Sequence, residues 1–207
     1  SDFGKTIYFK VPHRGDMIWK IYLSINLPSL IPPPTSTYAC WTNAIGYVLL
    51  ETLDLFIDGK LFDTQSGMSM FIRSQTAIKK DLYNGIKELV GIYDTTCSMR
   101  KNAQHIKNLI VPLDFWFCRE YNQALPLVAM KFSEVEIRIK LREFNECWVT
   151  SDGSTPTIGE GKFELEVLPE YIFLSNEERE MFVSRPHDII IEQNKYEAHV
   201  IKPAFDM

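Results

Sequence analysis

The sequence predicts an all-β protein: an antiparallel sandwich or barrel of about eight or nine strands, with two short helices in its loops. Three observations indicate this class. Apolar and polar residues alternate with a period of two in several segments. Turn-forming residues separate those segments, and a helical spacing of apolar residues occurs in only two places. Aromatic residues, which strands favour, make up 13% of the 207 residues.

The first two predicted strands are residues 6–11 (TIYFKV) and 16–27 (DMIWKIYLSINL), whose apolar residues fall at odd positions from Ile7 to Leu27. The sequence HRGD at 13–16 joins them and is expected to turn the chain in a hairpin. Residues 27–37 contain four prolines and are expected to form a rigid loop. These prolines either blunt a strand edge or only stiffen the loop.

A second hairpin and the first helix follow. Asp58-Gly59 separates LDLFI from KLFD, which is a strong hairpin signal. Residues 77–90 space their apolar side chains on one helical stripe, and Gly91 is a typical helix stop.

Two apolar blocks, VPLDFWFC (111–118) and ALPLVAMKF (124–132), flank the polar stretch 119–123. Each block is too short to cross a bilayer and charged residues interrupt them, so a membrane hairpin is excluded. The blocks are interpreted as two strands buried on both faces.

The last third of the chain alternates again. Residues 133–144 (SEVEIRIKLREF) and 162–167 (KFELEV) are predicted strands, separated by a polar stretch at 151–161. Ser175 and Glu178 form a capping-box pattern that starts a short helix, and Pro186 prevents its continuation. DIIIEQ (188–193) is interpreted as a further strand.

Composition narrows the function classes. The net charge is −5 and no run of five like charges occurs, which weighs against a nucleic-acid-binding surface. The four cysteines lack the spacing of a zinc site, and we expect reduced, mostly buried thiols in a cytosolic compartment. They are Cys40, Cys97, Cys118 and Cys147.

No convergent catalytic or metal-ligating set is visible. The four histidines (His13, His105, His187 and His199) do not pair as H-x-H. Cys40-Trp41 resembles a cysteine-protease nucleophile only superficially, and a buried thiol beside a core tryptophan is preferred. The glutamates at 134, 136, 164 and 166 could be paired acids of a glycosidase, but a solvated face paired with Arg138 and Lys140 is favoured.

Two further motifs have a structural interpretation. Arg14-Gly15-Asp16 matches an integrin-binding tripeptide, yet a turn needs Gly and Asp at such positions. The tryptophans at 19, 41, 116 and 148 and the phenylalanines beside Trp116 are expected in the core, with a sugar-stacking platform as the alternative.

The segment 111–132 resembles a V-P-L-x-F-W-F…A-L-P-L-x-A segment of the major capsid proteins of nucleocytoplasmic large DNA viruses. Other stretches are similar to that family in the same order: FKVPHRGDMIWKIYLSINLP (9–28), YACWTNAIGYVLLETLDLFIDGKLFD (38–63), and YIFLSNEEREMF (171–182) with the following IIIEQ. Asp58-Gly59 departs from the Gly-Gly that is common in the family, which a turn of this type tolerates.

This resemblance implies an antiparallel jelly-roll β sandwich. Family members carry two jelly rolls in tandem, form trimers of pseudo-hexagonal outline and tile an icosahedral shell. The chain is long enough for the first jelly roll only. We therefore expect residues 1–207 to be a single jelly-roll domain, the N-terminal one of two in a longer protein.

The resemblance implies a structural virion protein and no enzyme, with no catalytic, cofactor-binding or metal-binding residues and no cofactor. The expected partners are two further copies in a homotrimer, neighbouring capsomers and minor capsid proteins, without direct contact to nucleic acid. No transmembrane segment is expected, and contact with an inner viral membrane would be made through other proteins. The expected location is the virion capsid, assembled in the host cytoplasm. Residues 67–104 and 151–161 are the candidate contact loops, and a carbohydrate-binding jelly roll is the alternative function.

Overall fold

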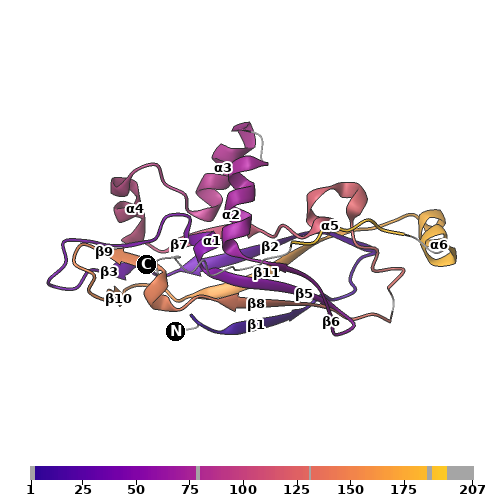
Figure 1. Cartoon of the computed structure of the whole chain (residues 1–207), viewed down its shortest axis with the longest axis horizontal. Coiled ribbons are helices and arrows are strands. Elements are labelled where there is room, and N and C mark those ends of the chain that lie inside the picture. The colour runs from indigo at the N-terminus through magenta and orange to yellow at the C-terminus, as the bar shows by residue number, and fades with distance from the viewer. Residues whose placement is uncertain (1–2, 78–79, 131, 186–187, 195–207) are drawn as a thin grey trace, which may run out of the picture.

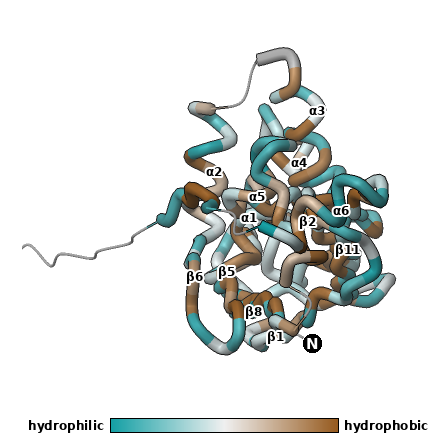
Figure 2. The backbone as a smooth tube through the Cα atoms, turned by 90° about the vertical axis from the view of Figure 1, so that its right-hand side faces the viewer, coloured by the Kyte–Doolittle hydropathy of each residue, from teal (hydrophilic) through white to brown (hydrophobic). Residues whose placement is uncertain are grey.

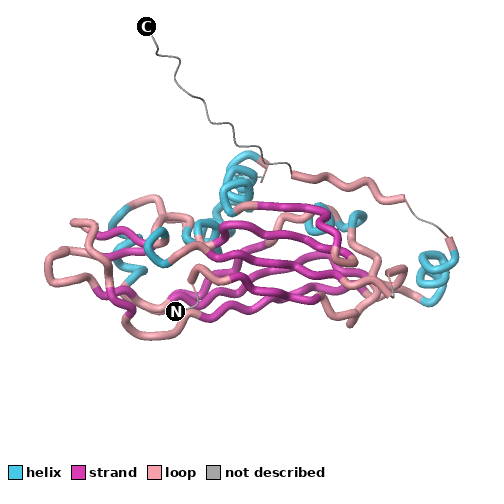
Figure 3. Tube along the Cα trace, turned by 60° about the horizontal axis from the view of Figure 1, so that its bottom comes forward, coloured by secondary structure: helices cyan, strands magenta, loops and turns pink. Residues whose placement is uncertain are grey.

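Two antiparallel sheets face each other in the computed structural model, which describes residues 3–77, 80–130, 132–185 and 188–194 (Figure 1). The first sheet has four strands, in the order β1 (Thr6–Lys10), β8 (Val135–Leu141), β5 (Leu50–Ile57) and β6 (Lys60–Gln65). The second has three strands, in the order β11 (Glu164–Ile172), β2 (Met17–Leu27) and β7 (Lys107–Pro112). Figure 3 shows these strands running along the long axis of the molecule. The predicted antiparallel β sandwich is confirmed.

Two short strand pairs extend one end of the sandwich. They are β3 (Leu30–Ile31) with β10 (Thr157–Ile158), and β4 (Ala39–Trp41) with β9 (Trp148–Thr150). The proline-containing segment 27–37, predicted as loop throughout, therefore contributes a two-residue strand.

The period-two pattern produces the core. In β8, Val135, Ile137, Ile139 and Leu141 are buried, while the residues between them face outward. This strand lies between β1 and β5 and pairs with both. The core between the sheets therefore follows the predicted alternation.

The alternation in β2 shifts at Trp19. The strand register with β11 shifts between Glu170 and Tyr171, so that Ile18 pairs with Tyr171 and Lys20 with Glu170. Trp19 is left without a partner in β11, which is the pattern of a β-bulge. Ile18 is buried and Trp19 is only half-buried, so the prediction of Trp19 on the core face is wrong, whereas the odd positions from Ile21 onward are confirmed.

The two predicted hairpins have different outcomes. Asp58 and Gly59 have φ angles of 51° and 75° and connect β5 directly to β6, as expected for a two-residue hairpin turn. Residues 13–16 form no hairpin, because β1 pairs with β8 in one sheet while β2 pairs with β11 and β7 in the other. This connection crosses from one sheet to the other.

The interpretation of the two apolar blocks as strands is wrong. β7 ends at Pro112, and the helical turn α5 (Trp116–Arg119) follows. The second block makes one isolated bridge, between Leu125 and Ile18, and then turns. The first block is mostly buried, whereas in the second block residues 124–127 are buried and Ala129 and Phe132 are exposed. The buried residues are covered by packing rather than by ladder pairing. Proline, which has no N–H, is disfavoured within a strand ladder.

Residues 188–193 also form no strand. The segment contacts β6 through side chains: Gln193 Nε2 donates to the Phe62 carbonyl oxygen (2.6 Å), and the Asn194 N–H donates to Asp63 Oδ1 (3.0 Å). We call residues 188–194 the strap.

The two predicted helices are confirmed as α3 (Lys80–Val90) and α6 (Asn176–Ser184). Gly91 (φ 75°) follows α3, and the capping box of Ser175 and Glu178 starts α6. Four further α-helices were not predicted: α1 (Ile45–Val48), α2 (Gly67–Thr76), α4 (Thr96–Ala103) and α5. Short 3₁₀ turns lie at Tyr121–Gln123 and Phe144–Glu146. Viewed along the long axis, α2, α3 and α4 stand on one side of the sandwich (Figure 2). Among the helices described, none has the length and apolar character to span a membrane.

Candidate assembly surfaces

The described residues contain no group of three or more His, Cys, Asp or Glu side chains that could hold a metal ion. His13 lies in the crossing between β1 and β2, and His105 follows α4. His187 and His199 lie outside the described residues. Within the described part of the chain, His13 and His105 lie on separate segments, and the candidate sites are surfaces.

Cys40 is a core residue. It is buried beside Trp41, whose indole Nε1 donates to the Pro28 carbonyl oxygen (3.1 Å) and whose ring stacks on Phe3. Burial raises the pKa of the Cys40 thiol, which disfavours the reactive thiolate. The structural interpretation of Cys40-Trp41 is confirmed.

The four glutamates do not converge. Glu134 pairs with Lys10 and Glu136 with Arg138 on the outer face of the four-stranded sheet. Lys140 pairs with Glu51 (2.7 Å), and Glu164 and Glu166 lie on β11 of the other sheet. The predicted solvated, ion-paired face is confirmed for Glu136 with Arg138. The glutamates at 134 and 136 and those at 164 and 166 belong to different sheets.

Asp16 of the Arg-Gly-Asp tripeptide is occupied by internal contacts. Its Oδ2 accepts hydrogen bonds from the Leu174 N–H (2.8 Å) and from Arg179 Nε (3.0 Å), so it fastens α6 to the crossing between the sheets. The Leu174 N–H and the Arg179 guanidinium lower the pKa of Asp16. A side chain on Gly15 would come within 2.6 Å of Tyr171. The hairpin turn expected at the tripeptide is not formed, but the contacts of Asp16 give this residue a structural role.

The aromatic residues of the 111–118 block pack in the core as expected: Phe115, Trp116 and Phe117 are at most 2% exposed. The most exposed aromatic side chains of the described chain are distributed over different elements: Tyr8 on β1, Tyr121 beside α5, Phe132 before β8 and Phe173 before α6. A sugar-stacking platform needs neighbouring exposed rings, and these four residues do not belong to one sheet face.

The helical layer formed by α2, α3 and α4 is the first candidate surface, and it lies within the predicted contact segment 67–104. Ile86 packs against the core and Val90 is buried, which fixes α3 to the sandwich. The layer carries exposed apolar residues on α2 (Met68 and Ile72) and on α3 (Leu82 and Leu89). Exposed apolar side chains are candidates for contact with a partner protein.

The second candidate surface, residues 151–161, is tied to the proline-containing loop. Ser151 Oγ accepts from the Thr37 N–H (2.9 Å) and lies 2.8 Å from Ser36 Oγ. Hydrogen bonds from Thr35 and from the backbone of Ser154 hold the pKa of Asp152 down, at about 2. Hydrogen bonds to the proline-containing loop therefore hold this loop in a defined conformation. Ile158 is an exposed apolar residue of this loop, and Val149 on β9 and Ile31 on the partner strand β3 are exposed next to it in the fold.

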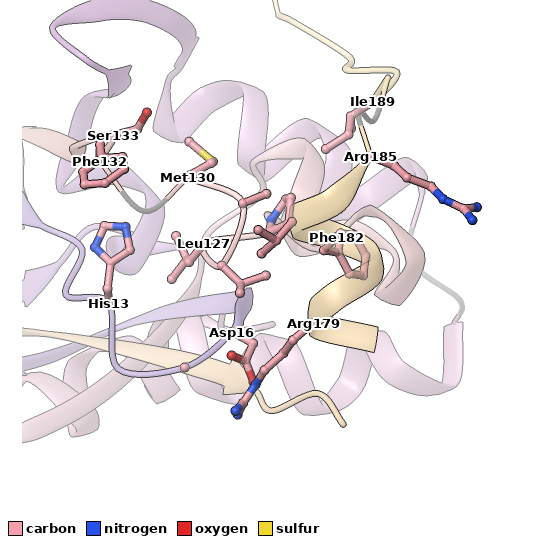
Figure 4. A pocket seen from close by; sticks show the side chains of 15 residues that line it. His13, Asp16, Leu127, Met130, Phe132, Ser133, Arg179, Phe182, Arg185 and Ile189 are labelled. Atoms are coloured by element: carbon pink, nitrogen blue, oxygen red, sulfur yellow. The ribbon is translucent and has the colours of Figure 1, made fainter. Parts of the chain in front are cut away.

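A third surface was not predicted. A groove of about 940 Å³ lies between the inter-sheet crossing, residues 126–133 and α6 (Figure 4). Leu127, Met130 and Phe182 line it, and Phe132 is 97% exposed at its side. The signal was present in ALPLVAMKF, which is more apolar than its partly exposed position needs. Assigning that block to a buried strand concealed it.

Comparisons with known proteins agree with the fold and with a shell-forming role for the relatives. A family model described as "Major capsid protein N-terminus" matches residues 1–175. The major capsid protein of Phaeocystis pouchetii virus is 30% identical, over 95% of this chain and 44% of that protein. Probable capsid protein 4 of Acanthamoeba polyphaga mimivirus is 38% identical, over 71% of this chain and 30% of that protein. The chain thus spans less than half the length of either relative.

Solved structures show the same architecture. VP54 of PBCV-1, in a crystal structure fitted into a reconstruction of the virophage Sputnik, has a TM-score of 0.76 at 24% identity, covering 92% of this chain and 43% of that one. The Faustovirus major capsid protein has a TM-score of 0.66 at 12% identity, covering 88% of this chain and 54% of that one. At these identities the likeness establishes the fold, a jelly roll, and nothing further.

Proposed function

The chain belongs to the major capsid protein family, and from this membership we propose that it is the first of two jelly-roll domains of a capsid subunit that assembles into trimers. The observation that carries the proposal is the family match over residues 1–175. It is supported by a β sandwich in which Cys40, Cys118 and Cys147 are buried, and by a helical layer that carries exposed apolar residues.

The helical layer is the proposed contact between copies. Obligate interfaces of this kind typically bury more than about 2,000 Å² in total, and they are more apolar than the remaining surface. Leu82 is 63% exposed on α3, close to the side chains that anchor this helix to the core. An apolar residue on a firmly attached helix is suited to packing against a neighbour, because little side-chain and backbone order has to be gained on binding.

Trimers of pseudo-hexagonal outline would then tile an icosahedral capsid, with residues 151–161 as a second contact loop. Neighbouring capsomers and minor capsid proteins are the proposed partners. The net charge of −5 disfavours direct contact with nucleic acid. The proposed location is the virion, after assembly in the host cytoplasm.

The test is the mass of the full-length protein by size-exclusion chromatography with light scattering. We expect a trimer at micromolar concentration. Leu82→Glu should weaken the trimer at least tenfold, because it places a charge in a desolvated contact. Leu61→Glu is the matched control, since Leu61 is 50% exposed on β6, outside the helical layer. A monomeric wild-type protein, or equal behaviour of the two variants, would contradict the proposal.

A further inference from the structure

A closed ring of three copies uses two different surfaces of each copy. Cyclic trimers are built from heterologous contacts, in which one surface of a copy meets another surface of the next copy. The helical layer supplies one of these surfaces in the proposed trimer. Its counterpart has to carry apolar side chains, because Met68, Ile72, Leu82 and Leu89 would otherwise stay in water.

The end of the molecule that holds α6 carries many exposed apolar side chains (Figure 1). Eighteen large apolar residues are exposed in the described part of the chain, and six of them belong to this end: Phe132, Phe173, Met181, Val183, Ile189 and Ile190. No residue of α6 is buried. A helix of nine residues gains most of its stability from packing, so a contact that covers α6 would stabilise it. We call α6 and these six residues the α6 end.

The groove of about 940 Å³ beside α6 gives this end room to receive a neighbour (Figure 4). Clefts of about 300–1,000 Å³ typically hold a drug-sized molecule, so several side chains fit in this one. The surface around residues 151–161 is less suited. Its exposed apolar residues are at most 51% exposed, at Ile31, whereas Phe132 beside the groove is 97% exposed. The α6 end is therefore the better counterpart of the helical layer.

The strap leads the polypeptide away from this groove. It runs back along the sandwich, where Glu192 pairs with Arg119 and the Asn194 N–H donates to Asp63 Oδ1 of β6 (3.0 Å) (Figure 3). Asp63 is only 3% exposed, so the strap is attached to a buried carboxylate. The described chain therefore turns from α6 toward β6, which favours a separate molecule as the occupant of the groove.

The two surfaces carry opposite charge. Residues 67–104 contain six basic and three acidic residues, although the whole chain has a net charge of −5. Residues 173–190 contain four acidic and two basic residues, and one of the basic ones, Arg179, is already paired with Asp16. Complementary charge favours contact between the two surfaces and disfavours the pairing of either surface with itself.

We propose that, around the trimer, the α6 end of each copy docks on the helical layer of the next copy. The apolar residues of α2 and α3 then cover the groove and α6, and the acidic residues of α6 stand beside the basic residues of the layer. This inference rests on the proposed function and specifies its interface.

Cross-linking of the full-length protein tests this pairing, because α4 of the helical layer carries an exposed native thiol, Cys97. With a short bismaleimide at a trimer-forming concentration, Val183→Cys should give a product of twice the mass of one copy. Mass spectrometry should find Cys97 joined to the new thiol at position 183 in that product. Leu61→Cys is the matched control and should give no such product, since Leu61 is exposed on β6, outside both surfaces.

The outcomes separate this inference from the proposed function. A trimer that lacks the product between Cys97 and position 183 would overturn the inference alone. Cys97 joined to Cys97 in the wild type would show that two helical layers pack on each other, and would overturn it as well. A monomeric wild-type protein would overturn the proposed function and the inference with it.

Maleimide labelling of Val183→Cys tests which molecule covers the groove. In the full-length protein diluted to a monomer the thiol at position 183 should react within minutes, and in the trimer it should react at least tenfold more slowly. Slow reaction in both states would show that the rest of the same polypeptide covers the groove. Fast reaction in both states would show that no copy covers it. Either result would overturn the inference.

A charge reversal gives an independent measurement. Glu180→Lys, at an exposed position of α6, should weaken the trimer several-fold at low salt, because it places a cation beside the basic layer. The loss should shrink at high salt, which screens exposed charges. Glu166→Lys on β11 makes the same change of charge outside both surfaces and should have a smaller effect. Equal losses for the two variants would contradict the inference.

Discussion

At the scale of single residues, Asp16 shows why a short motif needs its structural context. In the sequence it completes an Arg-Gly-Asp tripeptide, and in the structure its carboxylate joins two segments that are more than 150 residues apart. Charge-assisted hydrogen bonds to a mostly buried carboxylate contribute more than neutral ones do. Asp16 therefore holds α6 on the sandwich.

Replacing Asp16 tests this role. Asp16→Asn should lower the free energy of unfolding by about 1–3 kcal/mol at neutral pH, because it weakens the bonds to Leu174 and Arg179. The folded-state pKa of Asp16 lies below its unfolded value of about 4, so its contribution is fully present above that value and is lost as the pH falls through the folded-state pKa. Urea unfolding from pH 7 to pH 2.5 should show a gap between wild type and variant that narrows on acidification.

The control for Asp16→Asn is Glu180→Gln, a change of the same chemistry at an exposed position of α6. It should change the stability little at any pH. A gap for Asp16→Asn that is absent at neutral pH, or that widens toward low pH, would show that the carboxylate does not fasten the helix.

Single residues also mark the limit of the sequence pattern. Alternation placed Val135 to Leu141 correctly because every second residue in that run is apolar. In β2, Ile18 and Trp19 are both apolar, so the pattern could not tell which one faces the core. The bulge opposite Tyr171 decides it, and that bulge depends on the partner strand rather than on β2 itself.

At the scale of elements, the start of α2 packs closely against the backbone of α1 and β5. Gly67 begins α2, and a Cβ at this position would overlap the carbonyl oxygen of Tyr47 and lie 2.6 Å from that of Leu50. Both neighbours are backbone atoms, which cannot move aside as a flexible side chain can. The close approach fixes where the helical layer meets the sandwich.

Two glycine substitutions compare this contact with open space. Gly67→Ala should destabilise the chain by about 1–3 kcal/mol or more, as expected for overpacking against rigid neighbours. Gly85→Ala in α3 meets no atom within 4 Å and should stabilise it by about 0.5–1 kcal/mol, because alanine is the better helix former. Thermal unfolding by circular dichroism measures both. Equal effects of the two substitutions would mean that α2 can shift away from Tyr47.

The elements found from the sequence are those whose signals are local. The Asp58-Gly59 turn and the capping box at Ser175 operate within four residues. The strand assignments for 111–118 and 124–132 failed because apolar character was taken as evidence of strand pairing, whereas the buried residues of these blocks, such as Trp116 and Leu127, are buried by tertiary packing. α2 was missed because its capping box uses Ser69, not the glutamate or glutamine that marks such a box in a sequence.

At the scale of the whole molecule, the core draws on every part of the chain. Three thiols lie in it at separate places: Cys40 on β4, Cys118 on α5 and Cys147 just before β9. Burial raises the pKa of Cys118 and of Cys147 to about 12. The fourth thiol, Cys97, is exposed on α4. The sequence expectation of mostly buried thiols is therefore met by three of the four.

Thiol titration reports on this core as a unit. With Ellman's reagent at pH 8, one thiol of the native chain, Cys97, should react within minutes, and all four should react in 6 M guanidinium chloride. Cys97→Ser should abolish the reaction that is complete within minutes. The three buried thiols should still react in guanidinium chloride. Rapid reaction of Cys118 or Cys147 in the native chain would show that the sandwich opens far more readily than its packing indicates.

The fold class followed from periodicity, and the family followed from four ordered segments, but the candidate surfaces did not follow from either. Residues 67–104 were identified by resemblance as a contact segment without knowledge of which side chains would be exposed there. The groove beside Phe132 depends on which segments of the chain become neighbours. A single sequence does not show which segments those are.

The helices α2, α3 and α4 all lie in one connection, which leaves the four-stranded sheet after β6 and enters the three-stranded sheet at β7. No strand register passes through that stretch. Insertions or deletions in its exposed parts would leave every ladder of the sandwich in place, whereas Met70, Val90 and Ala103 have to stay because they belong to the core. In the proposed role, one face of the protein can therefore change in sequence and length through evolution while the two sheets keep their fold.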